Sequence, residues 1–293
     1  MLNVAVIAHS GKSLGGGLPA LRRALASEGV SDPFWREVRK SRKAPAQVRG
    51  ALEQGAELVF VWGGDGMVQR SVDVLAGSGA SLAVIPAGTA NLFAANLGIP
   101  EDIDEAVSIG LHGKRRLLDV GRFNGERFAV MAGVGFDAAM IRDAGDGGLK
   151  DRFGRAAYVW AGSGNLRAKP FRATIKVDGA SWYKGEASCI LVGNVSKLVG
   201  GVPAFEDARP DDGELDVGVV TAEGLLEWGR MFARVALRKT STSPFVQTTR
   251  ARSVKVKLKP KVLYELDGGA RAKVKSLTVK VEPDALQVCV PAD

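Results

Sequence analysis

The segment Glu57–Gly66 reads ELVFVWGGDG, an apolar run that ends in three glycines interrupted by one aspartate. The run predicts a buried strand, and the apolar spacing of Val68–Leu75 predicts a helix directly after it. Glycines let the backbone come close to a ligand, and a helix start offers N–H groups that suit phosphate. Asp65 could hold Mg²⁺ or accept a proton from an attacking hydroxyl. The alternative is a tight strand-to-helix turn in which Asp65 only caps the helix.

Two further loops have the same character. Pro86–Asn91, PAGTAN, follows the apolar run LAVI and precedes the helix-like NLFAANL. His9–Lys12, HSGK, follows the first apolar run, and Lys12 could pair with a phosphate. Because the carboxyl ends of parallel strands share one edge of a sheet, we expect the three loops to converge there and bind a nucleotide. Neither a Walker A loop nor a G-x-G-x-x-G motif is present, which disfavours P-loop proteins and simple dinucleotide-binding domains.

The order of the predicted elements divides the chain into two parts. Up to about Leu117, apolar runs alternate with helical patterns, which predicts a parallel sheet with crossover helices. Beyond it, short alternating segments predict antiparallel strands, with hairpin turns at Asn124-Gly125 and Asp178-Gly179. The predicted fold is an α/β N-terminal domain with a parallel sheet, followed by a mainly antiparallel β domain. The predicted strands are Leu2–Ala8, Glu57–Trp62, Leu82–Ile85, Ser253–Lys259, Val262–Leu266, Ser276–Val281 and Leu286–Val290, and the predicted helices are Leu18–Leu25, Val68–Leu75, Asp151–Leu166 and Glu223–Arg238.

The composition is that of a globular protein, with 293 residues of which 46% are hydrophobic and 25% charged. Two cysteines exclude a disulfide scaffold or a cysteine-rich metal site, and two histidines argue against a histidine-based hydrolase. No stretch is apolar for long enough to span a bilayer, and the first residues lack the features of a signal peptide, so we expect a cytoplasmic protein. The net charge of +8 predicts attraction to phosphates without choosing between nucleotides, nucleic acid and anionic lipid.

The lysine-rich stretch Lys255–Lys280 has two interpretations. In Val254–Lys259, VKVKLK, apolar residues alternate with lysines. One interpretation is a half-buried strand whose solvated lysine face also discourages edge pairing. The other is a face that meets anionic lipid, with about 1 kcal/mol gained per cation near the surface. The sequence alone favours the first, because charge runs usually form solvated faces.

Together these motifs resemble those of a known family. GGDG after a strand, followed by PAGTAN and NLFAANLGIP, resembles the catalytic domain shared by diacylglycerol kinases, bacterial lipid kinases and sphingosine kinases. The resemblance continues through LLDVGRFNGERFAVMAGVGFDA, ARPDDGELDV, YELDGG and EPDALQVCVP, so it covers nearly the whole chain. NAD kinases share GGDG, but PAGTAN and DDGELDV are typical of the lipid kinases.

The resemblance implies a fold and a site. An NAD-kinase-like α/β domain would span residues 1–118 and 283–293, and an antiparallel β-sandwich residues 119–282. ATP would lie between the domains as phosphoryl donor, and Asp65 would be catalytic. A structural Mg²⁺ site would use the side chain of Asp212 and carbonyls near Arg209 and Glu214, with Asp119 in the polar network near the metal, although a turn before Gly213 explains Asp212 equally well. The predicted nucleotide-binding residues are Ser10, Lys12, Gly63, Gly64, Asp65, Gly66, Met67, Gly88, Thr89 and Asn91.

The activity implied is Mg²⁺-dependent transfer of the γ-phosphoryl group of ATP to the hydroxyl of diacylglycerol or a related lipid. The partners expected are ATP, the lipid and an anionic membrane surface to which the protein binds peripherally, and no nucleic acid. A homodimer is left open. Two alternatives remain: a non-catalytic relative that binds a nucleotide or lipid, and an NAD kinase.

Three positions depart from the family pattern. Met67 stands where threonine is usual, and Leu92 stands where an aspartate is common. Gly269 replaces the glutamate of the usual DGE, which is the base proposed for bacterial diacylglycerol kinases. Three possibilities follow. Asp65 accepts the proton, or Asp267 or Glu265 of the YELDGG segment accepts it, or the chain is a non-catalytic relative.

Overall fold

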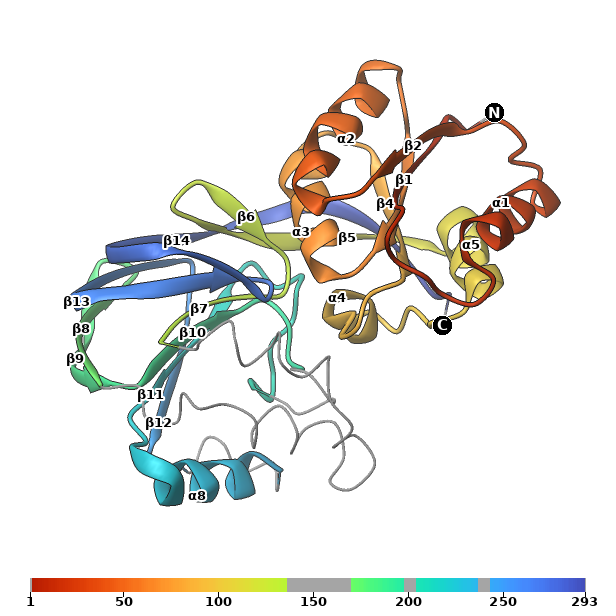
Figure 1. Ribbon diagram of the computed structural model, residues 1–293. Coiled ribbons are helices and arrows are strands. Elements are labelled where there is room, and N and C mark those ends of the chain that lie inside the picture. Colours follow the sequence, from red (N-terminus) through yellow and green to blue (C-terminus); the bar gives the residue numbers. More distant parts are fainter. Residues whose placement is uncertain (1, 136–169, 198–203, 237–242, 293) are drawn as a thin grey trace. The chain divides into compact units, whose positions relative to one another are not determined.

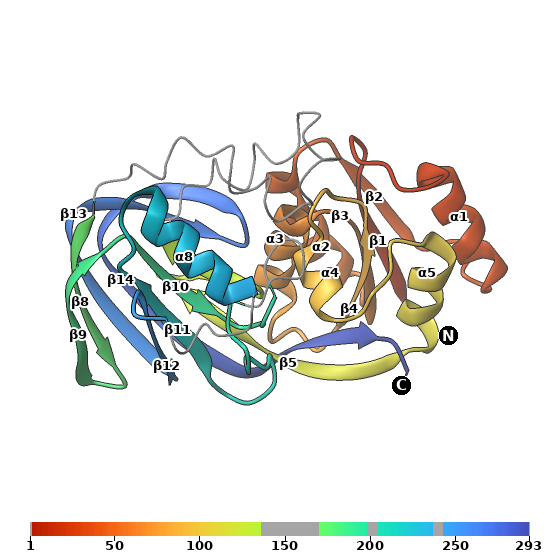
Figure 2. The same ribbon diagram turned by 90° about the horizontal axis from the view of Figure 1, so that it is seen from below.

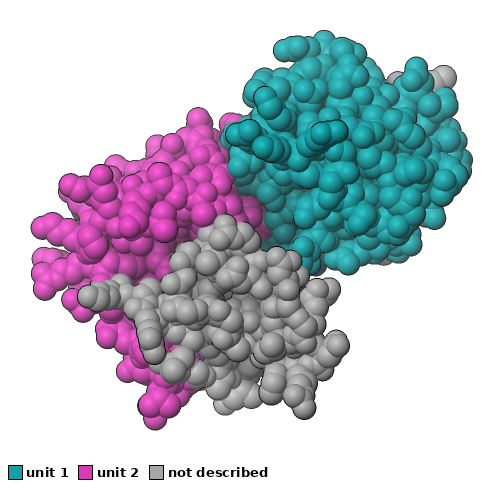
Figure 3. Space-filling view, viewed as in Figure 1, with its two compact units in different colours: residues 1–120, 283–293 teal, residues 121–282 magenta. Residues whose placement is uncertain are grey.

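The structure is a computed structural model that describes residues 2–135, 170–197, 204–236 and 243–292. The chain divides into two compact units, residues 1–120 with 283–293 (unit 1) and residues 121–282 (unit 2) (Figure 3). The sequence interpretation places these boundaries after residues 118 and 282.

Unit 1 is a parallel sheet with helices on both of its faces (Figure 1). The strands are β1 (Val4–His9), β2 (Phe34–Val38), β3 (Leu58–Gly63) and β4 (Ser81–Pro86), and the helices are α1 (Gly17–Ser27), η1 (Ser41–Lys43, 3₁₀), α2 (Ala44–Glu53), α3 (Asp65–Leu75), α4 (Leu92–Asn96) and α5 (Ile103–His112). The strand order is β2–β1–β3–β4, with every pair parallel. Helices α1 and α5 lie on one face and α2 and α3 on the other (Figure 2).

The inner strands explain the apolar runs of the sequence. Strands β3 and β4 are buried throughout, and β1 is buried up to its last residue, because helices cover both faces of the sheet. The predicted α/β class, the three predicted N-terminal strands and the helices predicted over Leu18–Leu25 and Val68–Leu75 are therefore confirmed. The sequence did not predict β2, whose FWREV mixes charged and aromatic residues because it is the last strand at that end of the sheet.

Unit 2 is built from antiparallel strands, which confirms the predicted β-rich domain. The order is β12–β11–β10–β7–β13–β14, with β9 and β8 added beside the first part of β13. Met231 of helix α8 packs against buried residues of β10 and β11. The elements are β5 (Lys114–Phe123), β6 (Glu126–Phe128), β7 (Met131–Val134), β8 (Phe171–Val177), β9 (Ala180–Ala187), β10 (Cys189–Gly193), β11 (Leu215–Val220), α8 (Gly224–Ala236), β12 (Val246–Ala251), β13 (Ser253–Leu266) and β14 (Gly269–Val290).

Both predicted hairpin turns are confirmed. Asn124 and Gly125 join β5 to β6 with φ of 48° and 106°, and Asp178 and Gly179 join β8 to β9 with φ of 49° and 89°. These left-handed conformations are what a two-residue hairpin requires. The helix predicted over Glu223–Arg238 is α8, whereas the helix predicted over Asp151–Leu166 lies outside the described residues.

The late strands are longer than the sequence suggests. Four predicted strands form two, β13 and β14, and the end of β14 pairs in parallel with β4 of unit 1, with Gln287 opposite Ser81. The alternation in Val254–Lys259 is half-buried as predicted, with apolar side chains inside and lysines exposed. The suggested role in edge protection is wrong, because this part of β13 pairs with β8 on one side and β14 on the other.

Candidate functional site

The first glycine loop lies between the end of β3 and the start of α3. The Gly64 carbonyl accepts the N–H groups of Met67 (2.8 Å) and Val68 (3.1 Å), which closes the first turn of the helix. A Cβ on Gly63 would lie 2.7 Å from the Cβ of Met67, so this position tolerates no side chain without a shift. A Cβ on Gly66 would meet no atom within 4 Å. Gly66 therefore faces open space at a helix start, where N–H groups lack intrahelical partners.

The second loop touches the first. A Cβ on Gly88 would lie 2.4 Å from the Cα of Gly64, and a Cβ on Gly64 would lie 2.9 Å from the Cα of Gly88. The N–H of Ala87 donates to the carbonyl of Gly63 at 3.0 Å. Neither Gly64 nor Gly88 has a positive φ, so it is the close approach of the two backbones that requires glycine at both positions.

Asn91 holds the second loop in shape. Its backbone is left-handed, with φ 48°, and its side chain is buried. The side-chain oxygen accepts the N–H of Gly88 (2.8 Å), and the side-chain nitrogen donates to the carbonyl of Gly88 (3.1 Å) and to Glu101 (2.8 Å). These contacts occupy the amide within the loop, so Asn91 positions the backbone of the loop.

Asp65 joins the first loop to the helix that follows the second. Its Oδ1 accepts the N–H of Phe93 near the start of α4, with 3.2 Å between the two atoms. Burial raises the pKa of the Asp65 carboxyl, while hydrogen bonds from the backbone of Phe93, Leu92 and Asn91 act in the opposite direction. A carboxylate with a raised pKa is a better proton acceptor, so the position suits a base as well as a metal ligand.

The third loop lies beside the other two. The Nε1 of Trp62, at the end of β3, donates to the carbonyl of Lys12 at 3.2 Å, and the N–H of Ser10 donates to the carbonyl of Val38 at 3.0 Å. The side chains of Ser10, Lys12 and Thr89 are exposed. The three loops predicted to converge thus lie along the same edge of the sheet, at the carboxyl ends of β1, β3 and β4.

Met67 differs from its predicted role. Its side chain is 1% exposed, and its N–H is bonded to the carbonyl of Gly64. Both features argue against a direct contact between Met67 and a nucleotide. The spacing of Met67, Ser71 and Leu75, one helical turn apart and all buried, is the signal that could have assigned Met67 to the core.

With this geometry in view, the comparisons with known proteins identify the family. Residues 3–123 match the diacylglycerol kinase catalytic domain, and residues 130–290 match the YegS C-terminal NAD kinase beta sandwich-like domain. The chain belongs to the diacylglycerol kinase catalytic-domain family.

Two relatives and one solved structure illustrate the similarity. A diacylglycerol kinase from Bacillus subtilis is 35% identical over 221 residues, which cover 72% of this chain and 71% of that protein. An uncharacterized protein from Synechocystis is 29% identical over 279 residues, covering 92% of this chain and 62% of that protein. The crystal structure of a putative diacylglycerol kinase from Bacillus anthracis has a TM-score of 0.80 at 22% identity, covering 98% of this chain and 95% of that one. This last likeness shows the shared fold.

None of the helices in the described part of the chain is long and apolar enough to cross a membrane.

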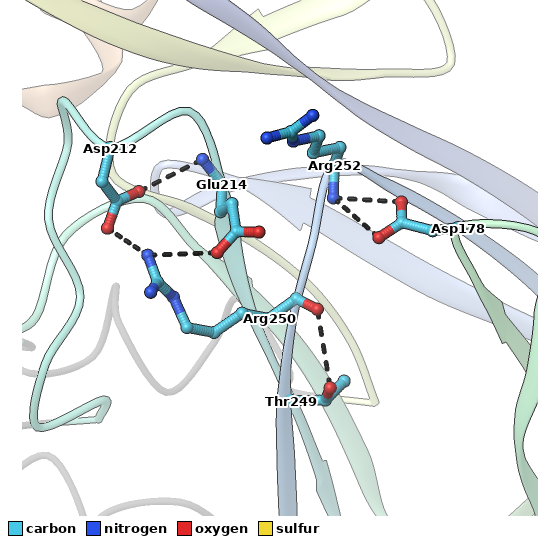
Figure 4. Close-up of polar contacts among 6 residues, drawn as sticks. All are labelled: Asp178, Asp212, Glu214, Thr249, Arg250 and Arg252. Carbon is cyan, nitrogen blue, oxygen red and sulfur yellow. Dashed lines mark hydrogen bonds and ion pairs between the residues drawn. The ribbon is translucent and has the colours of Figure 1, made fainter.

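At the predicted structural Mg²⁺ site, the side chains of Asp212, Glu214 and Arg250 contact one another (Figure 4). The Asp212 carboxylate accepts the N–H of Glu214 at 3.1 Å and forms an ion pair with Arg250. The guanidinium of Arg250 also lies 3.4 Å from the Glu214 carboxylate, while Arg209 is exposed on the same loop. Among the described residues, no three His, Cys, Asp or Glu side chains form a metal-binding group. The Asp212 carboxylate thus lies beside an arginine of β12.

Asp267 and Glu265, the two alternatives to Asp65 as base, lie in unit 2 and are both buried. The Asp267 carboxylate is buried and accepts the N–H groups of Ala129, Val130 and Met131 at 2.8–3.0 Å. Three such bonds fix it as an anchor for that segment. Glu265 is 1% exposed, and its Oε1 would lie 3.3 Å from a Cβ on Gly133. Asp119, of unit 1, is likewise buried and accepts the N–H of Asp284 at 2.9 Å, which ties β5 to β14.

The contact between Gly64 and Gly88 predicts a selective effect on stability. Gly88→Ala is expected to lower the Tm by about 3 °C or more, because overpacking typically costs about 1–3 kcal/mol. Gly66→Ala is the matched control, since its methyl group enters open space, and its Tm should equal or exceed that of the parent. Thermal unfolding followed by circular dichroism measures both. Equal losses in the two variants would show that the contact is not the constraint.

Asp216 predicts a pH-dependent effect. Burial raises its pKa from 3.8 to about 6, with Asp212, Asp207 and Glu214 adding to the rise and Arg250 opposing it. A folded-state pKa above the unfolded value means that this group's stabilisation is complete below about pH 3.8 and is lost as the pH rises through about 6. Asp216→Asn keeps the group neutral, so it should raise the Tm at about pH 8 and change it little at about pH 4. Thermal unfolding of the variant and the parent at both pH values measures this effect. A variant whose Tm at about pH 8 lies below that of the parent would contradict the prediction.

Proposed function

We propose that this protein is an ATP- and Mg²⁺-dependent lipid kinase that phosphorylates the hydroxyl of diacylglycerol or a related lipid. The observation that carries the proposal is the open space over Gly66, beside a loop contact that tolerates no side chain. Backbone N–H groups at such a place bind phosphate, because they donate without a side chain in the way. Membership of the diacylglycerol kinase family supports a lipid rather than NAD as acceptor.

In this proposal the chain's own groups hold and orient the phosphates. The amides of Gly64–Gly66 and the second loop around Gly88 and Thr89 would face the phosphates, and the exposed Lys12 would add a positive charge. Asp65 is the carboxylate in this cradle that could hold Mg²⁺, an ion that prefers carboxylate and phosphate oxygens. The metal would neutralise charge that develops on the transferred phosphoryl group.

The acceptor proton would go to Asp65. Burial already raises its pKa, and it lies in the phosphate loop where the acceptor hydroxyl must arrive. Asp267 is occupied by three backbone N–H groups, which makes it a poor alternative. Phosphoryl transfer with a loose transition state asks little of a base, so orientation supplies most of the rate.

One observation favours a second candidate, a non-catalytic nucleotide- or lipid-binding relative. Gly269 has no side chain, and a Cβ there would lie 2.7 Å from Nη1 of Arg271. That arginine forms an ion pair with Glu126 at 2.9 Å and donates to the carbonyl of Gly269. Position 269, where the family usually has glutamate, therefore lies beside Arg271, whose guanidinium is already paired with Glu126.

Asp65→Asn tests the proposed role directly. The amide oxygen can still accept the N–H of Phe93, so the fold and Tm should stay close to those of the parent. Turnover should fall by about 10²–10⁴-fold, the usual contribution of a positioned proton acceptor. The measurement is transfer of labelled γ-phosphate from ATP to diacylglycerol in mixed micelles, with NAD as a parallel acceptor. Unchanged turnover would remove Asp65 from the mechanism, and preferred transfer to NAD would overturn the lipid assignment.

Gly269→Glu separates the two candidate functions. The flexible end of Arg271 can move aside, because the atom nearest to the new Cβ is its Nη1. If the parent is a working kinase with Asp65 as base, the substitution should change the rate by less than about tenfold, since the base is already supplied. Gly269→Gln controls for bulk. A rise of several orders of magnitude with Glu but not Gln, from a parent rate near background, would show that the parent is a degenerate relative.

A further inference from the structure

The four strands β9, β8, β13 and β14 are neighbours in one sheet (Figure 1). The side chains on its two faces differ. The inner face supplies buried apolar residues to the core of unit 2, such as Ile175, Val254 and Val256. The outer face is made by the alternate residues, which are exposed or half-buried. It carries Arg172 and Lys176 on β8, Lys184 on β9, Lys255, Lys257 and Lys259 on β13, and Lys280 on β14, opposite Ser253.

The register places like charges directly opposite each other. Lys255 lies opposite Lys176, and Lys259 lies opposite Arg172. Glu186, opposite Arg172, is the acidic residue of these paired rows. Within the described residues, none of these lysines or Arg172 has an ion pair. Like charges opposite each other destabilise a sheet, so the arrangement has a cost that folding alone does not explain.

Edge protection does not explain this face either. Lysines discourage pairing when they lie on an edge strand. The lysine-bearing part of β13 is an interior segment, paired on one side with β8 and on the other with β14. Its cations instead extend the charge across neighbouring strands, with neutral residues such as Thr174, Ser276 and Thr278 between them.

We propose that this outer face, which we call the basic face, docks on the anionic surface of a lipid bilayer. A broad face of lysines suits a layer of headgroups, because a lysine binds phosphate as a point charge without a fixed geometry. The proposed lipid substrate is used only to choose a bilayer over other anionic surfaces. Single-stranded nucleic acid is a less suitable partner for this face. Proteins that bind it usually offer aromatic side chains on which bases stack, and the paired rows of this face carry none.

The expected strength follows from the number of cations. Each lysine near an anionic membrane contributes about a fivefold gain in affinity at low salt. Removal of three charges from the face should therefore weaken vesicle binding by about 100-fold. The same substitutions relieve repulsion between opposite strands, so the Tm should stay the same or rise.

The test compares two triple variants of equal charge change. Lys255→Gln/Lys257→Gln/Lys259→Gln removes charge from the basic face, and Lys40→Gln/Arg42→Gln/Lys43→Gln removes it from exposed residues around η1 in unit 1. Sedimentation with phosphatidylcholine vesicles containing about 30% phosphatidylglycerol, without ATP or diacylglycerol, measures binding independently of kinase activity. The face variant should lose about 100-fold and the control variant much less.

Four outcomes would overturn the proposal. They are unchanged binding of the face variant, an equal loss in the control variant, equal binding of the parent to pure phosphatidylcholine, and tighter binding of the parent to single-stranded DNA than to the anionic vesicles. If the face variant fails to fold, the parent alone still decides, because its vesicle binding must fall steeply as salt rises from about 0.05 to about 0.5 M. Binding that does not depend on salt contradicts the proposal. Vesicle binding without phosphoryl transfer would contradict the proposed kinase and leave the basic face standing.

Discussion

The close approach of Gly64 and Gly88 is the constraint on which the candidate site depends. A side chain at either position would lie within 3 Å of the other backbone. Because the two loops touch, the carboxylate of Asp65 reaches the N–H of Phe93, and the start of α3 lies beside the loop that Asn91 holds in its left-handed turn. The parallel register of β3 and β4, which sets Gly63 opposite Pro86, brings the loops together. In the proposed function, phosphate binding would depend first on where these two strands end, and the side chains would refine it.

The carboxylates of the protein show how differently one charge can be accommodated. Asp267 is held by three backbone N–H groups, and Asp212 by a guanidinium. Asp65 has weaker compensation, because burial outweighs its hydrogen bonds and raises its pKa. A buried carboxylate with incomplete compensation is open to a metal ion or a proton, and Asp65 is such a group between the two glycine loops, which supports its proposed role.

Much of the fold could be predicted because its signals are local. Continuous apolar runs marked β1, β3 and β4, and Asn-Gly and Asp-Gly marked two hairpins. What could not be predicted depends on distant pairing. The donors to Asp267 lie 136–138 residues earlier, and the partner of Asp212 lies 38 residues later. The sequence showed the alternating lysines of β13, but only the register with β8 reveals that cations oppose cations. The resemblance placed Met67 among the nucleotide-binding residues, whereas its side chain is buried along the inner face of α3.

Backbone amide exchange with and without Mg·ATP tests the central claim most directly. If the joined loops bind the phosphates through their N–H groups, exchange should slow at Gly64–Gly66, at Gly88–Thr89 and around Lys12. Exchange should change little in those strands of unit 2 that lie away from the points where the chain passes from one unit to the other. The parent should lose this protection when Mg·ATP is replaced by adenosine, because adenosine carries no phosphate. Protection that is absent from both glycine loops, or that persists with adenosine alone, would contradict the account.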